Sequence, residues 1–181
     1  MVYVVAAVVA TAVFCVFNLV LTLGLVRRQR LLGTTSGVGW APPDGDLVLG
    51  AGERVGPFRA QTVDGEPVSD DVLHGGTVVG FFAPGCQPCA ELLPVFVDRV
   101  GRIPGGRAAA LAVLSGSGDG SESYVAALAD VSRVVIEPTD GPVAAAFGVR
   151  SFPAFVVLDD QQRVRGSGVT AGVFLTPAAA R

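Results

Sequence analysis

The sequence contains no lysine, and its basic side chains are thirteen arginines spread along 181 residues. The formal net charge is −3, and no basic cluster is interleaved with aromatic residues. Nucleic-acid binding depends on such a cluster, because much of its affinity comes from contacts with phosphate. We therefore expect no nucleic-acid partner.

Cysteine is also scarce, with three residues at Cys15, Cys86 and Cys89. Three cysteines cannot form a disulfide-stapled scaffold, so the chain must fold around an ordinary apolar core. A zinc site requires four ligands, and beyond the pair Cys86/Cys89 the sequence offers only Cys15 and its single histidine, His74. We expect no metal and no cofactor, and we interpret His74 as a solvated loop residue.

Charge is absent from one long stretch at the N-terminus, Val2 to Val26. This run exceeds the roughly 20 residues that a helix needs to cross the hydrocarbon core of a bilayer. It predicts one transmembrane helix over 1–26, because a cleaved signal peptide would show a basic leader and a small-x-small cleavage site. Arg27, Arg28 and Arg30 follow directly, and the positive-inside tendency would keep the rest of the chain in the cytoplasm.

The remainder divides by composition into three parts. Residues 27–51 are rich in Gly, Pro, Ser and Thr, which predicts a flexible linker. Residues 52–168 contain apolar runs and helical patterns in turn, which predicts one α/β domain. Residues 169–181 form a short C-terminal tail.

The segment Thr77 to Pro94 organises this domain. An apolar strand over 77–83 is followed by the break Pro84-Gly85 and by a helix over 86–100 that carries Cys86 and Cys89 on its first turn. The unpaired N–H groups at a helix N-terminus stabilise an anion, so they favour the thiolate of Cys86. A thiolate with a second thiol three residues later predicts redox chemistry, with a structural disulfide as the alternative.

Further elements are expected around this segment. Apolar residues on either side of Asp64-Gly65 predict a hairpin, and a second strand over 108–114 predicts a parallel pair with the first. A helix over 124–131, a strand over 133–137 and a short helix over 141–147 follow, and Gly148 caps the last of these. Pro153 then precedes an apolar strand, either as an ordinary strand start or with a cis Phe152-Pro153 bond.

Two segments, FFAPGCQPCAELLP and FGVRSFPAFVVLDDQQRV, resemble the membrane-tethered thiol-disulfide oxidoreductases of the TlpA and ResA type. The opening segment GERVGPFRAQTVDGEPVS resembles their first hairpin, and the likeness covers about Gly52 to Gly168. The resemblance implies a thioredoxin-like α/β fold, with a mixed central sheet flanked by helices. It also implies protein thiols and disulfides as partners and places the domain outside the membrane, in conflict with the arginines after the N-terminal run.

The resemblance assigns roles to individual residues. Cys86 would be the exposed nucleophile and Cys89 the resolving thiol. Pro153 would be a cis-proline facing them, and the backbone of Phe152 would pair with an extended substrate segment. Pro84, with Gly85, stands where a tryptophan usually precedes the motif, so we expect Pro84 to affect substrate docking.

One departure from the thioredoxin pattern concerns proton transfer. Thioredoxins carry a buried aspartate six residues before the first cysteine, and this chain has Gly80 there. Glu91 resembles an acidic residue found just after the motif in ResA-type proteins, so it is the candidate proton acceptor for Cys89. Gln87 and Pro88 supply no cation to the thiolate, which favours a reductant or isomerase over a strong oxidant.

Two other functions remain open. A peroxiredoxin-type thiol peroxidase shares the hairpin and the fold. However, its cysteine follows a Pro-x-x-x-Thr/Ser approach, whereas Pro84 lies only two residues before Cys86 and no hydroxyl residue stands between Phe81 and Cys86. A non-catalytic tethered module that presents a thioredoxin-like groove is the third possibility.

Overall fold

The computed structural model describes residues 1, 14, 47–73, 75–116, 118, 120–170 and 172–173. The chain divides into two units, Met1–Trp40 and Ala41–Arg181, and nearly all described residues belong to the second. Within the described part, no helix has the length and apolar character needed to cross a membrane. Most of the predicted span and linker lies outside the described residues, as do Cys15, His74 and residues 174–181.

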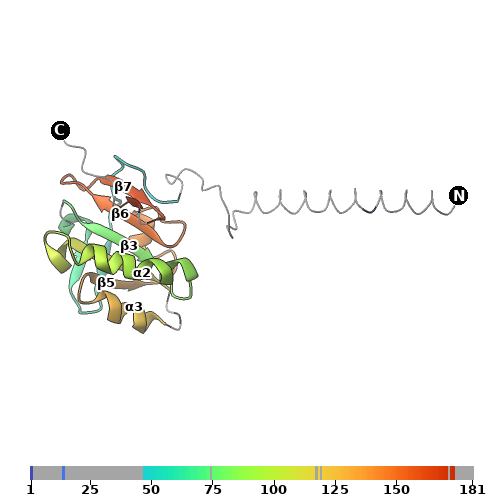
Figure 1. Ribbon diagram of the computed structural model, residues 1–181. Helices are drawn as coiled ribbons and strands as arrows, with labels where there is room; N and C mark the ends of the chain where they lie inside the picture. The colour runs from blue at the N-terminus through green and yellow to red at the C-terminus, as the bar shows by residue number, and fades with distance from the viewer. Residues whose placement is uncertain are drawn as a thin grey trace. The chain divides into compact units, whose positions relative to one another are not determined.

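A five-stranded mixed sheet forms the centre of the second unit (Figure 1). The strand order is β5-β4-β3-β6-β7, in which β3, β4 and β5 run parallel and β6 and β7 are antiparallel to their neighbours. The strands are β3 (Val78–Phe82), β4 (Ala110–Ser115), β5 (Arg133–Glu137), β6 (Ala154–Leu158) and β7 (Val164–Gly168). Every residue of β3, β4 and β6 is buried, which explains why these strands read as continuous apolar runs.

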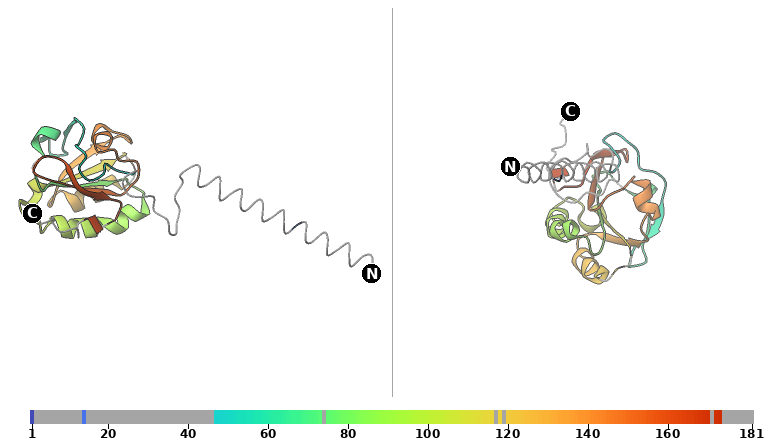
Figure 2. Two further views of the ribbon diagram at one scale, coloured as in Figure 1. Left: turned by 90° about the horizontal axis from the view of Figure 1, so that it is seen from above. Right: turned by 90° about the vertical axis from the view of Figure 1, so that its right-hand side faces the viewer.

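Helices cover both faces of this sheet (Figure 2). The α2 helix (Gln87–Val100) and the α3 helix (Ser121–Leu128) pack on one face. The short α4 helix (Pro142–Ala146) and the hairpin of β1 (Arg59–Gln61) and β2 (Pro67–Ser69) pack on the other. Side chains therefore alternate along the strands between two apolar clusters, one on each face.

The α2 helix approaches β3 closely at Gly80. A Cβ atom built on Gly80 would lie 2.6 Å from Cε2 of Phe96 and 3.0 Å from Cε2 of Phe82. The rings of Phe96 and Phe82 lie 5.3 Å apart in an edge-to-face arrangement, and both side chains are fully buried. The space beside Gly80 is therefore already filled by an aromatic ring of α2.

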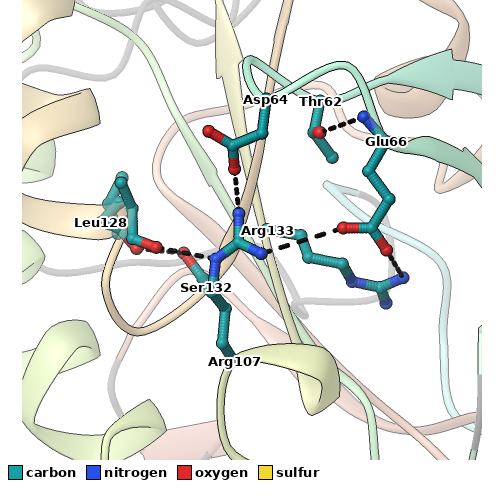
Figure 3. A network of polar contacts seen from close by, with 8 residues as sticks. Thr62, Asp64, Glu66, Arg107, Leu128, Ser132 and Arg133 are labelled. Carbon is teal, nitrogen blue, oxygen red and sulfur yellow. Dashed lines mark hydrogen bonds and ion pairs between the residues drawn. The ribbon is translucent and has the colours of Figure 1, made fainter.

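Polar side chains link the β1–β2 hairpin to the outer edge of the sheet (Figure 3). Arg107, from the short helix η3 (Gly106–Ala109), pairs with Asp64. Arg133 begins β5 with a side chain only 7% exposed, and its Nη1 lies 3.9 Å from Oε1 of Glu66. Burial lowers the pKa of Arg133, the carboxylate of Glu66 raises it, and the charge of Arg107 lowers it. Two hairpin carboxylates thus balance two arginines at the sheet edge.

Most predicted elements are confirmed, with shifts at their ends. The strand predicted over 133–137 and the parallel pairing of the first two sheet strands match the structure. The α3 helix ends at Leu128 instead of 131, because Leu128 O accepts bonds from Val131 N and Ser132 N and closes the helix. It begins earlier than predicted, directly after Gly120, which has a φ of +101°. The β7 strand was not predicted.

The first prediction tests the close approach at Gly80. Gly80→Ala should lower the free energy of unfolding by about 1–3 kcal/mol, because the added methyl overpacks a filled core. Chemical denaturation of the full chain measures this difference. Gly166 on β7 provides the control, since a Cβ there meets only Val173 at 3.9 Å. Gly166→Ala should be neutral or slightly stabilising, and equal losses from both substitutions would contradict the packing argument.

Candidate functional site

The turn between β3 and α2 holds Cys86 at the start of the helix. Gly85 has a φ of +81°, a conformation that glycine adopts without strain, and Cys86 N donates a hydrogen bond to Ala83 O at 3.2 Å. Cys86 is the N-cap residue of α2, and its carbonyl accepts the bond from Ala90 N at 3.1 Å. The Pro84-Gly85 break therefore delivers Cys86 to a helix N-terminus, as predicted.

Cys86 and Cys89 form a disulfide. The amide of Cys89 donates to Sγ of Cys86 at 3.3 Å, so the sulfur serves as the side-chain cap of the helix. An N–H group directed at sulfur stabilises negative charge there, as does the positive end of the helix dipole. Once the disulfide is reduced, these two features would stabilise a thiolate at Cys86.

The loop before β6 lies against this sulfur. Phe81 pairs with Ala154, so the residues after β3 and the residues before β6 meet at one end of the sheet. The Phe152-Pro153 bond is cis, which decides between the two alternatives left by the sequence. The Phe152 carbonyl oxygen lies 3.7 Å from Sγ of Cys86. In the disulfide this sulfur has no hydrogen to donate, whereas a reduced thiol could donate to Phe152 O.

The two sulfurs have different surroundings. Cys86 is partly exposed, whereas Cys89 is fully buried in the cluster between α2, α3 and the sheet. A reagent from solution can therefore reach Cys86 but not Cys89. This asymmetry gives Cys86 the geometry of the attacking sulfur and Cys89 that of the resolving one.

No buried carboxylate of the described residues lies on the Cys89 side of the sheet. The single buried carboxylate of that part of the chain is Glu137, which accepts bonds from Val143 N and Ala144 N of α4, on the opposite face of the sheet. The cluster around Cys89 contains one titratable side chain besides the cysteines, Tyr124, and burial raises the pKa of its phenol. Burial in such an environment disfavours a thiolate at Cys89.

The geometry does not support the proton-acceptor role predicted for Glu91. Glu91 follows Cys89 by two residues, which places it about 200° around the helix from a fully buried side chain. Its side chain is exposed, and Oε1 accepts a hydrogen bond from Nε2 of Gln87 at 2.9 Å. The aromatic ring of Phe96, which fills the space beside Gly80, was not anticipated from the sequence.

Pro84 and Phe152 belong to the two loops next to Cys86, the turn between β3 and α2 and the loop before β6. Pro84 is partly exposed on the β3–α2 turn, and a Cβ built on Gly118 would lie 3.6 Å from its Cβ. Phe152 is partly buried and contacts both apolar clusters, whereas Pro153 is buried. Of the two residues predicted to bind substrate, Phe152 lies against Cys86 through its carbonyl oxygen, at 3.7 Å from the sulfur.

The described residues contain no group of three or more His, Cys, Asp or Glu side chains placed to hold a metal ion.

Comparisons with known proteins identify the fold. No protein-family model and no curated protein matches the chain. Among solved structures, it is similar to the thioredoxin domain of a thiol-disulfide oxidoreductase from Bacteroides vulgatus, with a TM-score of 0.57 and 15% identity over 71% of this chain and 95% of that one. A thio-disulfide isomerase from Thermus thermophilus gives a TM-score of 0.54 and 23% identity over 68% and 89% of the two chains.

A third similar structure is a secreted disulfide oxidoreductase of Mycobacterium tuberculosis that is homologous to DsbE of E. coli. It gives a TM-score of 0.51 and 22% identity over 68% of this chain and 87% of that one. At these identities the likeness establishes the fold. The predicted thioredoxin-like α/β fold with a mixed sheet is therefore confirmed.

The second prediction concerns the proton of Cys89. A thiolate is the attacking species in disulfide exchange, and the one buried carboxylate of the described residues, Glu137, lies on the opposite face of the sheet from Cys89. The rate at which Cys89 attacks a mixed disulfide at Cys86 should therefore rise about tenfold per pH unit, as long as most of the Cys89 thiol is still protonated. Stopped-flow release of a chromophoric thiol from Cys86 measures this rate. Glu91→Gln should leave it within about twofold, and a pH-independent rate or a large loss in Glu91→Gln would contradict the interpretation.

Proposed function

We propose that this chain is a thiol-disulfide oxidoreductase that exchanges disulfides with protein partners through Cys86 and Cys89. The observation that carries the proposal is the pairing of a partly exposed sulfur at the N-terminus of α2 with a fully buried one three residues later. The similar solved structures support it, because they are thiol-disulfide oxidoreductases and an isomerase on the same fold.

The reaction begins from the reduced dithiol. The Cys86 thiolate attacks one sulfur of a partner disulfide, a bond forms between Cys86 and that sulfur, and the other partner sulfur leaves as a thiolate. Cys89 then loses its proton to solvent and attacks Sγ of Cys86, which releases the second partner sulfur. The net result is one partner disulfide reduced to two thiols and one Cys86–Cys89 disulfide formed. Every step is reversible.

The partner segment would dock beside the cis-proline loop. The Phe152 carbonyl oxygen lies 3.7 Å from Sγ of Cys86, so a partner strand that pairs with the backbone of Phe152 would bring its own sulfur close to Cys86. Pro153 would fix this loop, and Pro84 would contact the partner from the other side of the sulfur. These roles for Phe152, Pro153 and Pro84 are part of the proposal.

The same carbonyl bears on the reactivity of Cys86. In the free dithiol, the Cys86 thiol can donate a hydrogen bond to Phe152 O, which stabilises the protonated form. This effect is opposite to that of the helix N-terminus, which stabilises the thiolate. A partner N–H that bonds to Phe152 O would remove this acceptor. We therefore expect the thiolate to be favoured most when a partner strand is docked.

The direction of exchange would be reductive or isomerising. Gln87 and Pro88 are exposed and uncharged, so no side chain between the cysteines adds to the stabilisation of the thiolate by the helix. A strong oxidant requires a strongly stabilised thiolate. Without a cation between the cysteines, we expect a weaker stabilisation than a strong oxidant requires.

We also propose that the run Val2 to Val26 tethers the domain to a membrane. The support is its length and lack of charge. Arg27, Arg28 and Arg30 favour a cytoplasmic domain, whereas the resemblance to tethered oxidoreductases favours the outer side. A Cys15→Ser/Cys89→Ser variant leaves Cys86 as the single thiol. Its labelling by a membrane-impermeant reagent in intact cells would place the domain outside, and labelling only after lysis would place it inside.

The third prediction tests the two sulfurs. Cys86→Ser should abolish the reduction of insulin or a model disulfide, because the accessible nucleophile is removed. Cys89→Ser should accumulate mixed disulfides with partner proteins, since the resolving step is lost. Turnover assays and non-reducing gel analysis of the full chain measure the two effects.

Cys15→Ser is the matched control and should keep full activity, because Cys15 belongs to the predicted membrane span. Retained turnover in Cys86→Ser would rule out the proposed chemistry. Consumption of peroxide faster than disulfide exchange would indicate a thiol peroxidase instead. Partner capture that survives loss of both cysteines would indicate a binding module.

A further inference from the structure

The loops next to the dithiol carry little charge. Residues 83–85, in the turn between β3 and α2, have no charged side chain. Residues 169–170 follow β7 at the same end of the sheet, because Gly168 pairs with Phe155, and they are also uncharged. The loop before β6, residues 149–153, contains one charged side chain, Arg150. Arg150 is therefore the single charge on the described residues of these three loops.

Hydrogen bonds and core packing hold the backbone of Arg150 in place. Its amide donates to Leu47 O at 2.9 Å, and the amide of Val149 donates to Ala144 O at 2.9 Å. Val149 is itself part of the apolar cluster on the α4 face of the sheet. Two residues after Arg150, the Phe152 carbonyl oxygen lies 3.7 Å from Sγ of Cys86. The loop thus presents Arg150 two residues from its contact with the sulfur.

The side chain of Arg150 is exposed, and it forms no ion pair or side-chain hydrogen bond with any described residue. Arg102, Arg107 and Arg133, in contrast, each lie next to a carboxylate. A guanidinium binds a carboxylate through paired N–H donors. Arg150 can therefore bind an acidic side chain of a partner without first breaking a contact within the described part of the domain.

Two exposed acids near this end of the domain, Glu91 and Asp140, lie away from the loop of Arg150. Glu91 follows Cys86 by five residues, which places it about 140° around the helix from Cys86. Asp140 follows β5, which lies two strands from β3 on the side opposite to β6 (Figure 1). A partner strand that pairs with the backbone of Phe152 would therefore run alongside Arg150 and not alongside these carboxylates.

The spacing of an extended chain indicates which partner residue would meet Arg150. Such a chain advances about 3.3 Å per residue, and Arg150 precedes Phe152 by two residues. A partner strand that brings its cysteine to Cys86 by pairing with Phe152 would place the residue two positions from that cysteine beside Arg150. A charge at this partner position would consequently be felt at the site of exchange.

We propose that Arg150 selects protein partners that carry a carboxylate about two residues from the reactive cysteine. This inference rests on the proposed function, because it names the partner class of the same disulfide exchange. The ion pair forms before the Cys86 thiolate attacks, so it raises the rate of productive encounter. The net charge of the chain, −3, would by itself favour a basic partner, so a preference for an acidic one must come from a local cation.

Peptides that differ in one side chain test this selection. Each peptide carries one cysteine as a mixed disulfide with pyridine-2-thiol, and glutamate, glutamine or lysine stands two residues before or two residues after it. The reduced full chain, with Cys15→Ser to remove the unrelated thiol, is placed in phosphatidylcholine nanodiscs at low ionic strength. The Cys86 thiolate attacks the peptide sulfur, and the leaving thiolate takes up a proton to give pyridine-2-thione. The absorbance of this product gives the second-order rate constant.

In at least one of the two placements, the glutamate peptide should react about three- to tenfold faster than the lysine peptide. An exposed ion pair gives a modest attraction, and lysine meets repulsion instead. High salt should reduce the difference. Arg150→Gln should remove it, and Arg150→Glu should reverse it.

Arg54→Gln is the matched control and should retain the preference. It removes the same charge from an exposed residue at the opposite end of the sheet, because Arg54 pairs with Arg163 next to the start of β7, where Val164 lies opposite the last residue of β6. Loss of the preference in Arg54→Gln to the same extent as in Arg150→Gln would mean that only the total charge matters, and it would overturn the proposal.

Equal rates for the glutamate and lysine peptides in both placements would also overturn it, as would a preference that survives Arg150→Gln. A preference that appears only after Asp46→Asn would contradict it as well, because Asp46 directly precedes Leu47 in the sequence and would then be neutralising Arg150. Failure of the proposed function would give a different result, in which even the uncharged glutamine peptide reacts no faster with Cys86 than with free cysteine.

Discussion

The antiparallel register between β3 and β6 is the constraint on which the site depends. Because Phe81 pairs with Ala154, the turn after β3 and the loop before β6 emerge at the same end of the sheet. That arrangement brings the sulfur at the start of α2 within 3.7 Å of the Phe152 carbonyl. A shift of one residue in this register would turn the apolar side chains of β6 to the opposite faces. The core on both faces of the sheet therefore fixes the geometry around Cys86.

The burial of Cys89 and the closeness of α2 to β3 have a common origin. The ring of Phe96 fills the space beside Gly80, so α2 packs against β3 without room for a side chain at that position. This packing stabilises the domain, but it leaves the inner sulfur in an apolar environment. The two sulfurs are consequently unlike each other, with polar backbone groups and solvent at Cys86 and aromatic rings in the cluster around Cys89. The helix N-terminus activates one sulfur, and the core shields the other.

Much of this arrangement could be predicted from the sequence, because the strongest signals are local. The apolar run that becomes β3, the Pro84-Gly85 break and the cysteine pair together predict a dithiol at the N-terminus of a helix. The cis bond at Pro153 was one of two alternatives, since a proline at a strand start is compatible with both isomers. The β7 strand was missed because its sequence, VRGSG, holds two glycines and one apolar side chain. Phe96 and Glu91 show the limit of such reasoning, because the environment of Cys89 depends on which side chains α2 turns toward the sheet.

The central claim is that the Cys86–Cys89 disulfide is a reversible redox centre and not a structural link. Equilibrating the full chain in mixtures of reduced and oxidised dithiothreitol tests it most directly. Alkylation mass analysis counts the free thiols, and circular dichroism follows the fold. The account predicts a reversible change between disulfide and dithiol with the fold retained in both states, because two apolar clusters, built mostly from side chains other than the cysteines, hold the sheet and helices together. Loss of the folded signal together with the disulfide, or a disulfide that resists reduction, would contradict it.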